Sequence, residues 1–191
     1  MPRPKTHDEA LRVRLLDRAG QLLSTAGPEA LSLRRLAADV GTSTTAVYSL
    51  FGGKPALVRE LYTAAFQRFG ARLSEVDCSG EPAEDLVRMG LAYRRAALAE
   101  PHLYSIMFTK AVAGFEPDHE AAGHVLAPMV AVGRRAGVPD PETAAMTVWG
   151  LAHGLVSLEL NGNLTDSGQV ERVLRAGLAT PQRENAHTAP Y

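Results

Sequence analysis

Short or flat polar side chains are concentrated in residues 42–49, and a lysine follows at Lys54. Side chains of this kind make hydrogen bonds to a partner surface and need little room to do so. The lysine ammonium adds a positive charge that can bind a phosphate. These residues therefore suggest recognition of a polar, anionic partner. The candidate recognition residues are Arg34, Ser43, Thr44, Thr45, Tyr48, Ser49 and Lys54.

Two short helices are expected to position these side chains. Ser32 is a suitable N-cap for a helix over 33–40, and Gly41 would stop that helix. Thr42 or Ser43 can cap the next helix, which is expected to run to about residue 50. The spacing thus predicts a helix pair joined by a tight turn.

Three residues meet the steric demands of a steep crossing between these helices. Ala37 is small enough for the point of closest approach, and Gly41 tolerates a positive φ in the turn. Val47 supplies an apolar anchor that faces back to the first helix. The apolar residues expected to complete this small core are Leu33, Leu36, Val40, Phe51 and Leu57.

With Val47 turned inward, the second helix would present four side chains to the outside. Thr44, Thr45, Tyr48 and Ser49 could then enter a DNA major groove without steric conflict. Lys54 and Arg34, each in the first turn of a neighbouring helix, could contact phosphates on either side. A structural helical hairpin that binds no DNA is the alternative, since small and apolar residues at this spacing also arise by chance.

The rest of the chain also indicates helices, and no segment shows sustained alternation of the strand type. The fold class expected is all-α, with about nine helices. Beyond the pair above, helices are predicted at about 8–26, from residue 54, and at 82–99, 101–112, 118–136, 140–160 and 166–178. The predicted domains are a helix-turn-helix domain at 1–53 and a helical domain at 54–180, followed by a tail at 181–191 without fixed structure.

Charge and composition restrict the partners and the compartment. Residues 1–57 hold eight Lys and Arg against five acids, whereas the remainder holds twelve against sixteen. A basic N-terminal part and an acidic remainder suit a chain that meets a polyanion at one end.

A single cysteine excludes a disulfide within the chain. Neither a secretory signal nor an apolar run long enough to span a bilayer occurs, so a cytoplasmic protein is expected.

Residues 15–57 resemble the tetracycline-repressor (TetR) family of bacterial regulators. The most specific part is a string of seven residues: Gly41, Ser43, Val47, Tyr48, Phe51, Lys54 and Leu57. The resemblance implies a homodimer formed by the last two helices, with a ligand pocket in the C-terminal domain. It also implies that Tyr48 and Lys54 contact phosphates and that a repressor leaves its palindromic operator when the effector binds. Thr45 and Leu50 depart from the common family residues, so the operator sequence does not follow.

The C-terminal half resembles one branch of that family through a Trp149-x3-His153-Gly154 string and a segment that begins at Pro101. Aromatic, methionine and histidine side chains on several helices would suit a small apolar effector. Ordinary core packing is the alternative for each of them. The candidate pocket residues are Met89, Tyr93, Tyr104, Met107, Phe108, Trp149 and His153.

Gly154 and a neighbouring apolar run raise the question of what this helix packs against. Gly154 permits close helix approach, either in a dimer interface or within the chain. The run of Leu151, Leu155 and Leu158 predicts burial in both cases.

Other functional classes find less support in the sequence. No nucleophile–base pair, carboxylate dyad or phosphate loop is present, so an enzyme is not expected. His119 and His124 lie five residues apart with no cysteine nearby, and neither a metal nor a cofactor is predicted. A helical module that binds a small molecule without binding DNA remains the alternative function.

Overall fold

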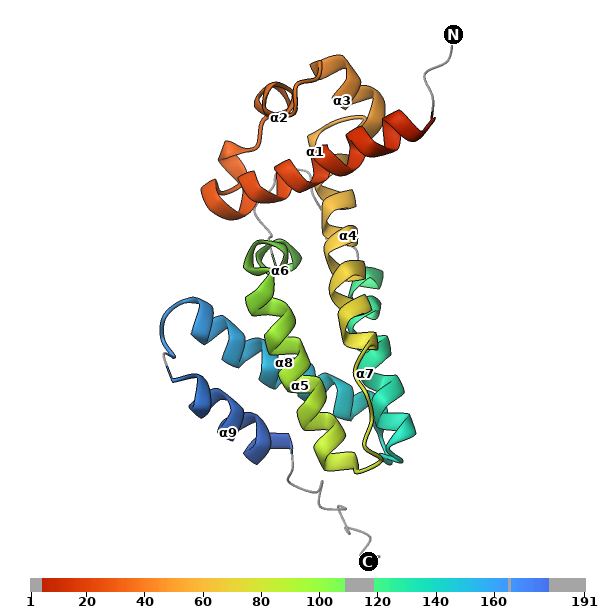
Figure 1. Ribbon diagram of the computed structural model, residues 1–191, viewed down its shortest axis with the longest axis vertical. Coiled ribbons are helices and arrows are strands. Elements are labelled where there is room, and N and C mark those ends of the chain that lie inside the picture. The colour runs from red at the N-terminus through yellow and green to blue at the C-terminus, as the bar shows by residue number, and fades with distance from the viewer. Residues whose placement is uncertain (1–4, 109–118, 165, 179–191) are drawn as a thin grey trace, which may run out of the picture. The chain divides into compact units, whose positions relative to one another are not determined.

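A computed structural model describes residues 5–108, 119–164 and 166–178 (Figure 1). Within these ranges it contains nine α-helices, two 3₁₀ turns and no strand, which confirms the all-α prediction. The helices are α1 (Lys5–Ala26), α2 (Leu33–Val40), α3 (Thr44–Phe51), α4 (Lys54–Ser74), α5 (Pro82–Ala99), α6 (Pro101–Met107), α7 (Gly123–Arg135), α8 (Pro141–Leu160) and α9 (Ser167–Leu178). The 3₁₀ turns are Pro28–Ala30 and His119–Ala122. No helix in the described ranges is long and apolar enough to cross a membrane.

The chain forms two compact units. Among the described residues, the first comprises 5–72, 96–108 and 119–125, and the second comprises 73–95, 126–164 and 166–178. Most of α4 therefore groups with the N-terminal helices. The domain boundary at residue 53 stays a prediction. The tail predicted at 181–191 lies outside the described residues.

Two predicted helices differ in length from those observed. The helix expected over 101–112 ends as α6 at Met107, with Phe108 as its C-cap, and residues 109–112 lie outside the described ranges. The helix expected over 118–136 begins as a 3₁₀ turn, and α-helical geometry starts only at Gly123. Glycine is a poor helix former, which is consistent with a late start of α7 at this position.

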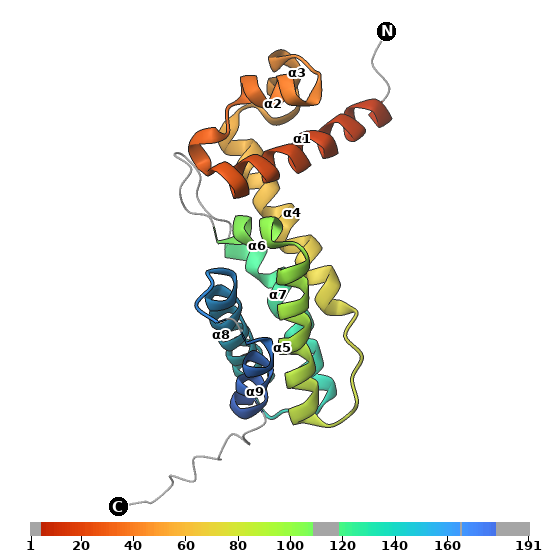
Figure 2. The same cartoon turned by 60° about the vertical axis from the view of Figure 1, so that its left-hand side comes forward.

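The first unit is built on α1, which carries α2 and α3 on one side (Figure 1). Leu15 and Ala19 of α1 have no exposed surface, as the period of its apolar residues predicts. α6 also packs against α1: a Cβ added at Gly20 would lie 3.2 Å from Ile106 (Figure 2). α1 thus supports the helix-turn-helix and contacts a more distant part of the chain.

A close contact between α4 and α7 depends on Gly70. A Cβ added there would overlap the backbone carbonyl of His124. Pro128, four residues further along α7, has no N–H to donate to that carbonyl. Gly70 is therefore required where it stands, although glycine is unfavourable inside a helix.

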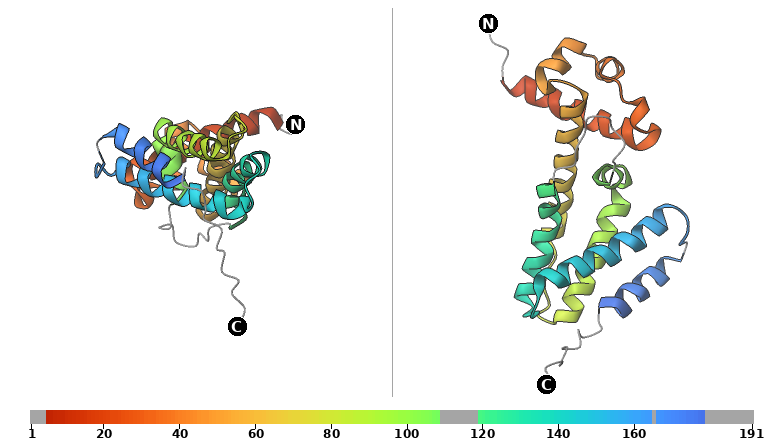
Figure 3. Two further views of the ribbon diagram at one scale, coloured as in Figure 1. Left: turned by 90° about the horizontal axis from the view of Figure 1, so that it is seen from below. Right: turned by 180° about the vertical axis from the view of Figure 1, so that it is seen from behind.

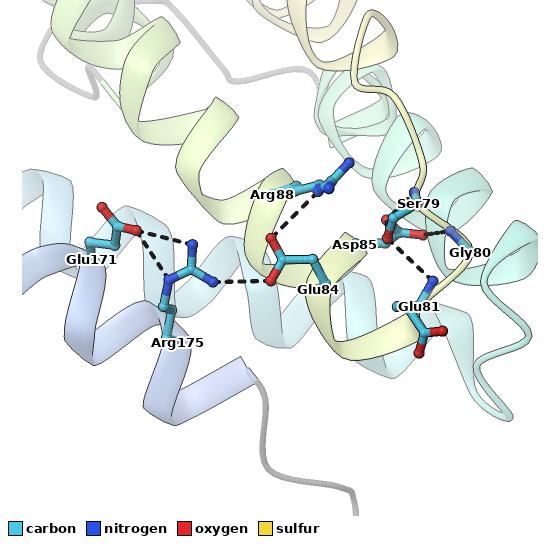
Figure 4. A network of polar contacts seen from close by, with 8 residues as sticks. All are labelled: Ser79, Gly80, Glu81, Glu84, Asp85, Arg88, Glu171 and Arg175. Atoms are coloured by element: carbon cyan, nitrogen blue, oxygen red, sulfur yellow. Dashed lines mark hydrogen bonds and ion pairs between the residues drawn. The ribbon is translucent and has the colours of Figure 1, made fainter.

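In the second unit, α8 and α9 pack side by side (Figure 3). α9 also packs on α5, because Leu174 and Leu178 lie 3.2 Å from a Cβ placed on Gly90. Arg175 of α9 reaches Glu84 of α5 at 3.0 Å (Figure 4). Close apolar packing and an ion pair therefore join these two helices.

A buried carboxylate fixes the start of α5. Asp85 has no exposed surface and accepts hydrogen bonds from the backbone N–H groups of Ser79 and Gly80 and from the Ser79 hydroxyl (Figure 4). Burial raises the pKa of Asp85, but these hydrogen bonds and the charge of Arg88 outweigh it, and the pKa lies below its usual value. The carboxylate therefore stays ionised and holds the segment before α5 against the helix.

Candidate nucleic-acid interface

The turn between α2 and α3 has the geometry that the sequence predicts. The Ser32 hydroxyl accepts a hydrogen bond from the N–H of Arg35 at 3.2 Å, and Ser43 accepts one from Ala46 at 3.1 Å. Gly41 has a φ of 74°, in the left-handed region that the turn requires. Ser43, rather than Thr42, is the cap of α3. Both helices thus begin at a serine cap, and α2 ends at a glycine.

The predicted core of this helix pair is also observed. Val47 has no exposed surface and Ala37 is 2% exposed, so both residues are buried, as their predicted roles require. The other residues predicted for this core are all buried: Leu33, Leu36, Val40, Phe51 and Leu57. Burial of this side of α3 fixes which side faces outward.

The outward side of α3 carries the candidate recognition residues. Tyr48 is 54% exposed, Thr45 and Ser49 are exposed, and Thr44 is half-buried. Ser43 is exposed, although its hydroxyl oxygen is used as the cap. A polar surface on a short, capped helix is the arrangement with which a helix-turn-helix reads base edges.

Two basic residues flank α3 in the sequence, one before it and one after it. Arg34 is exposed in the first turn of α2. Lys54 is half-buried and begins α4, two residues after the left-handed Gly52 that caps the end of α3. The first turn of a helix directs its N–H groups toward an incoming anion, and a cation there strengthens phosphate binding. These positions suit phosphate contacts.

Three other arginines of the basic N-terminal part are engaged within the protein. Arg14 donates to the Val40 carbonyl at 2.5 Å, and Arg18 pairs with Asp39 at 2.7 Å. Arg12 binds both carboxylate oxygens of Glu60. The net positive charge of residues 1–57 therefore overstates the number of basic side chains that are available to bind a polyanion. Sequence reasoning missed these roles, because a paired arginine and a solvent-exposed one look alike in a sequence.

The candidate pocket residues lie in both compact units. In the second unit, Met89 and Tyr93 have no exposed surface, and Trp149 donates a hydrogen bond to the Tyr93 hydroxyl at 3.2 Å. His153 is half-buried one turn after Trp149, and burial lowers its pKa, which favours the neutral imidazole. An apolar wall with a few polar groups is typical of small-molecule sites.

The other pocket candidates belong to an aromatic cluster in the first unit. Tyr104 and Met107 are buried, whereas Phe108 is 37% exposed. The Tyr104 ring lies 6.0 Å from that of Phe69 and 5.1 Å from that of Phe108. These residues pack within α4 and α6 of their own unit, and an effector contact stays a prediction for all seven.

Comparisons with known proteins agree with this geometry. Residues 15–61 match the family of bacterial regulatory proteins named tetR, and residues 86–180 match the tetracyclin repressor-like C-terminal domain. The chain belongs to the TetR family. The first match covers the helix-turn-helix and the start of α4, so the exposed side of α3 is the candidate DNA surface of a TetR-family regulator. No curated protein matches the chain.

Solved structures show the same fold. The regulatory protein SCO4313 is 26% identical, with 93% of this chain and 98% of that chain covered and a TM-score of 0.73. A protein of unknown function from Rhodococcus sp. RHA1 is 25% identical over 93% of this chain and 100% of that chain, with a TM-score of 0.70. A TetR-family transcriptional regulator from Rhodococcus sp. is 16% identical, covers 90% and 100%, and has a TM-score of 0.65. At that identity the last likeness concerns the fold alone.

The TetR-family match places the chain among transcriptional regulators. Within the described ranges, no three His, Cys, Asp or Glu side chains gather as metal ligands would. The side chain of His119 is not among those described.

Proposed function

We propose that this TetR-family protein is a homodimeric transcription repressor that leaves its DNA operator when a small apolar effector binds. The observation that carries the proposal is the exposed polar side of α3, held outward by the buried Val47 and the left-handed Gly41. Two such helices, one from each subunit, would enter successive major grooves of a near-palindromic site. Such a protein would act in the cytoplasm, where the bacterial chromosome lies.

Support for the dimer comes from α8. Met146 and Leu158 are 54% and 44% exposed, and the exposed Gly150 and Gly154 lie between them at intervals of four residues. A Cβ added at either glycine meets no described atom of the chain within 4 Å. An apolar helix face with room for close approach suits a second copy of α8 better than it suits water.

Support for an effector comes from the second unit. Met89 and Tyr93 are buried one turn apart on α5, and Trp149, which donates a hydrogen bond to the Tyr93 hydroxyl, is half-buried one turn before the half-buried His153 on α8. An effector must bind the DNA-incompetent state more tightly by a few kcal/mol in order to release the operator. Trp149 is the only tryptophan of the chain, so its fluorescence can report candidate effectors without a label.

DNA binding can be tested with a duplex that the wild-type protein selects from a random pool. The double variant Thr44→Ala/Tyr48→Ala removes two of the four candidate groove-facing side chains and should lower duplex affinity by about tenfold for each lost contact. Fluorescence anisotropy over a range of salt concentrations measures both the affinity and the number of phosphates contacted. Thermal unfolding should change little, because Tyr48 is exposed and Thr44 is only half-buried.

A matched control is Thr25→Ala, which removes a threonine hydroxyl that donates to Gln21 within α1. Its duplex affinity should equal that of the wild-type protein. Specific binding that persists in Thr44→Ala/Tyr48→Ala would contradict the assigned surface. Failure of the wild-type protein to bind any duplex would favour the alternative, a helical module that binds only a small molecule.

A further inference from the structure

Arg12 of α1 contacts both the end of α3 and the second turn of α4. Its guanidinium binds the two carboxylate oxygens of Glu60 through Nε and Nη2. Its Nη1 donates to the Leu50 carbonyl at 3.4 Å. The guanidinium carbon lies 5.1 Å from the centre of the Phe51 ring, within the range of a cation–π interaction. One side chain therefore joins three helices.

Two of the residues that Arg12 contacts lie at the end of α3. Leu50 and Phe51 are the last two residues of α3, and Tyr48 on the exposed side lies less than one turn earlier. Phe51 is 6% exposed and closes the core under the helix pair. A cation near the last carbonyls of a helix is favourable, because those carbonyls carry the negative end of the helix dipole. Arg12 thus stabilises the end of α3 and ties it to α4.

The remaining features of Arg12 favour an internal role over a phosphate contact. Its side chain is 33% exposed and that of Glu60 is 29% exposed, so the pair is partly shielded from water. The hydrogen bond with Glu60 raises the pKa of Arg12 although burial acts in the opposite direction. Nε, Nη1 and Nη2 each have a partner within the protein. A DNA phosphate would have to compete with Glu60 for this guanidinium.

We propose that Arg12 is a positioning residue, which acts through Glu60 and the end of α3 to set the orientation in which α3 meets DNA. This inference rests on the proposed DNA-binding function. Loss of the pair would leave every candidate base and phosphate contact in the chain while allowing α3 to rotate relative to α4. Affinity for the duplex would fall because the same side chains no longer reach the groove together.

Four variants and the selected duplex test this role: Arg12→Gln, Glu60→Gln, the exchange Arg12→Glu/Glu60→Arg, and Arg18→Gln as a control. Arg18 is a matched control because it is also an arginine of α1 that pairs with a carboxylate of another helix, Asp39 of α2. Its other hydrogen-bond partner, Gln21, lies on α1 itself. For each variant, anisotropy gives the dissociation constant and its salt dependence, and titration at high protein concentration gives the active fraction. Glu60→Gln keeps the shape of the side chain and serves if Arg12→Gln folds poorly.

Arg12→Gln and Glu60→Gln should each raise the dissociation constant by about tenfold, the size of a coupling within one ion-pair network. The salt dependence and the active fraction should stay unchanged, the exchange should recover most of the affinity, and Arg18→Gln should have a smaller effect. A salt slope that falls by about one in Arg12→Gln alone would instead identify a phosphate contact. A reduced active fraction with an unchanged dissociation constant would indicate a purely structural role.

Three other results would overturn the inference. They are unchanged affinity in both single variants, an exchange variant as weak as the single ones, and an equal loss in Arg18→Gln. If the wild-type protein binds no duplex, the proposed DNA-binding function itself is wrong. That result can be told apart from the three above, each of which requires a wild-type protein that binds.

Discussion

The helices α3 and α8 each have a face that the described part of the chain leaves exposed, and the two faces differ in chemistry. The exposed side of α3 carries Thr45, Tyr48 and Ser49. The exposed side of α8 carries Met146 and Leu158. A polar face is stable in water and available for a polar ligand, whereas an apolar face is stabilised by removal from water. The difference suits the two partners proposed above: a nucleic acid at α3 and a second copy of the chain at α8.

The comparison is tested most severely by placing charge on the apolar face. Met146→Glu/Leu158→Glu should raise the dissociation constant of the dimer by at least about a hundredfold, because like charges across an interface cost several kcal/mol. Sedimentation equilibrium measures this constant directly. The control is Val13→Glu, which changes a 49% exposed apolar residue of α1 and should leave assembly unaltered. A double variant that associates as well as wild-type protein would place the dimer interface elsewhere.

A second test compares a helix glycine that its own chain covers with one that it leaves open. Gly70→Ala should destabilise the protein by about 2 kcal/mol, because the new methyl group overlaps the His124 carbonyl. Gly154→Ala should add up to about 1 kcal/mol of stability to a dissociated chain, because alanine favours the helix and meets no described atom there. Urea unfolding measures both changes.

The effect of Gly154→Ala depends on whether it is introduced into the dissociated double variant or into the wild-type protein. In the dissociated Met146→Glu/Leu158→Glu protein only the gain in helix stability should appear. In the wild-type background, Gly154→Ala should weaken association, because the methyl group keeps the two copies of α8 apart. A stabilised dimer with Gly154→Ala would show that this glycine is not at the interface.

The smallest expected effects concern the N-caps of the two helices. Ser43→Ala should cost about 1 kcal/mol with little dependence on pH, because its hydroxyl does not titrate in the acidic range. At α8 the cap is Asp140, whose pKa is lowered because it accepts a hydrogen bond from Thr143. Its contribution is therefore fully present above the unfolded pKa and is lost as the pH falls through the folded value.

Asp140→Asn keeps a capping side chain but removes the charge. Stability measured against pH, at and below the usual aspartate pKa of about 4, should then change less steeply than in wild-type protein. Other carboxylates with lowered pKa values, such as Asp85, contribute the remaining slope. An identical pH profile for Asp140→Asn would show that the charge of Asp140 makes no measurable contribution to stability.

Local signals explain why the helix-turn-helix was predicted closely. Ser32, Gly41 and Val47 act on residues within a few positions of themselves, so their effects can be deduced from spacing alone. The environment of Leu158 was harder to predict. The apolar run to which it belongs predicts burial, yet in a single chain the residue is 44% exposed. Periodicity identifies an apolar side chain that needs cover but not the surface that covers it.

The sequence by itself determined the all-α fold, the cap and hinge residues of the helix pair, and the polar character of α3, because these follow from local backbone preferences and helical periodicity. Tertiary structure decided which charges remain available. It showed Arg12, Arg14 and Arg18 engaged within the protein, and it separated the pocket candidates into two compact units. The physical reason is that ion pairs and core contacts join residues far apart in the chain, and their partners are fixed only when the helices pack.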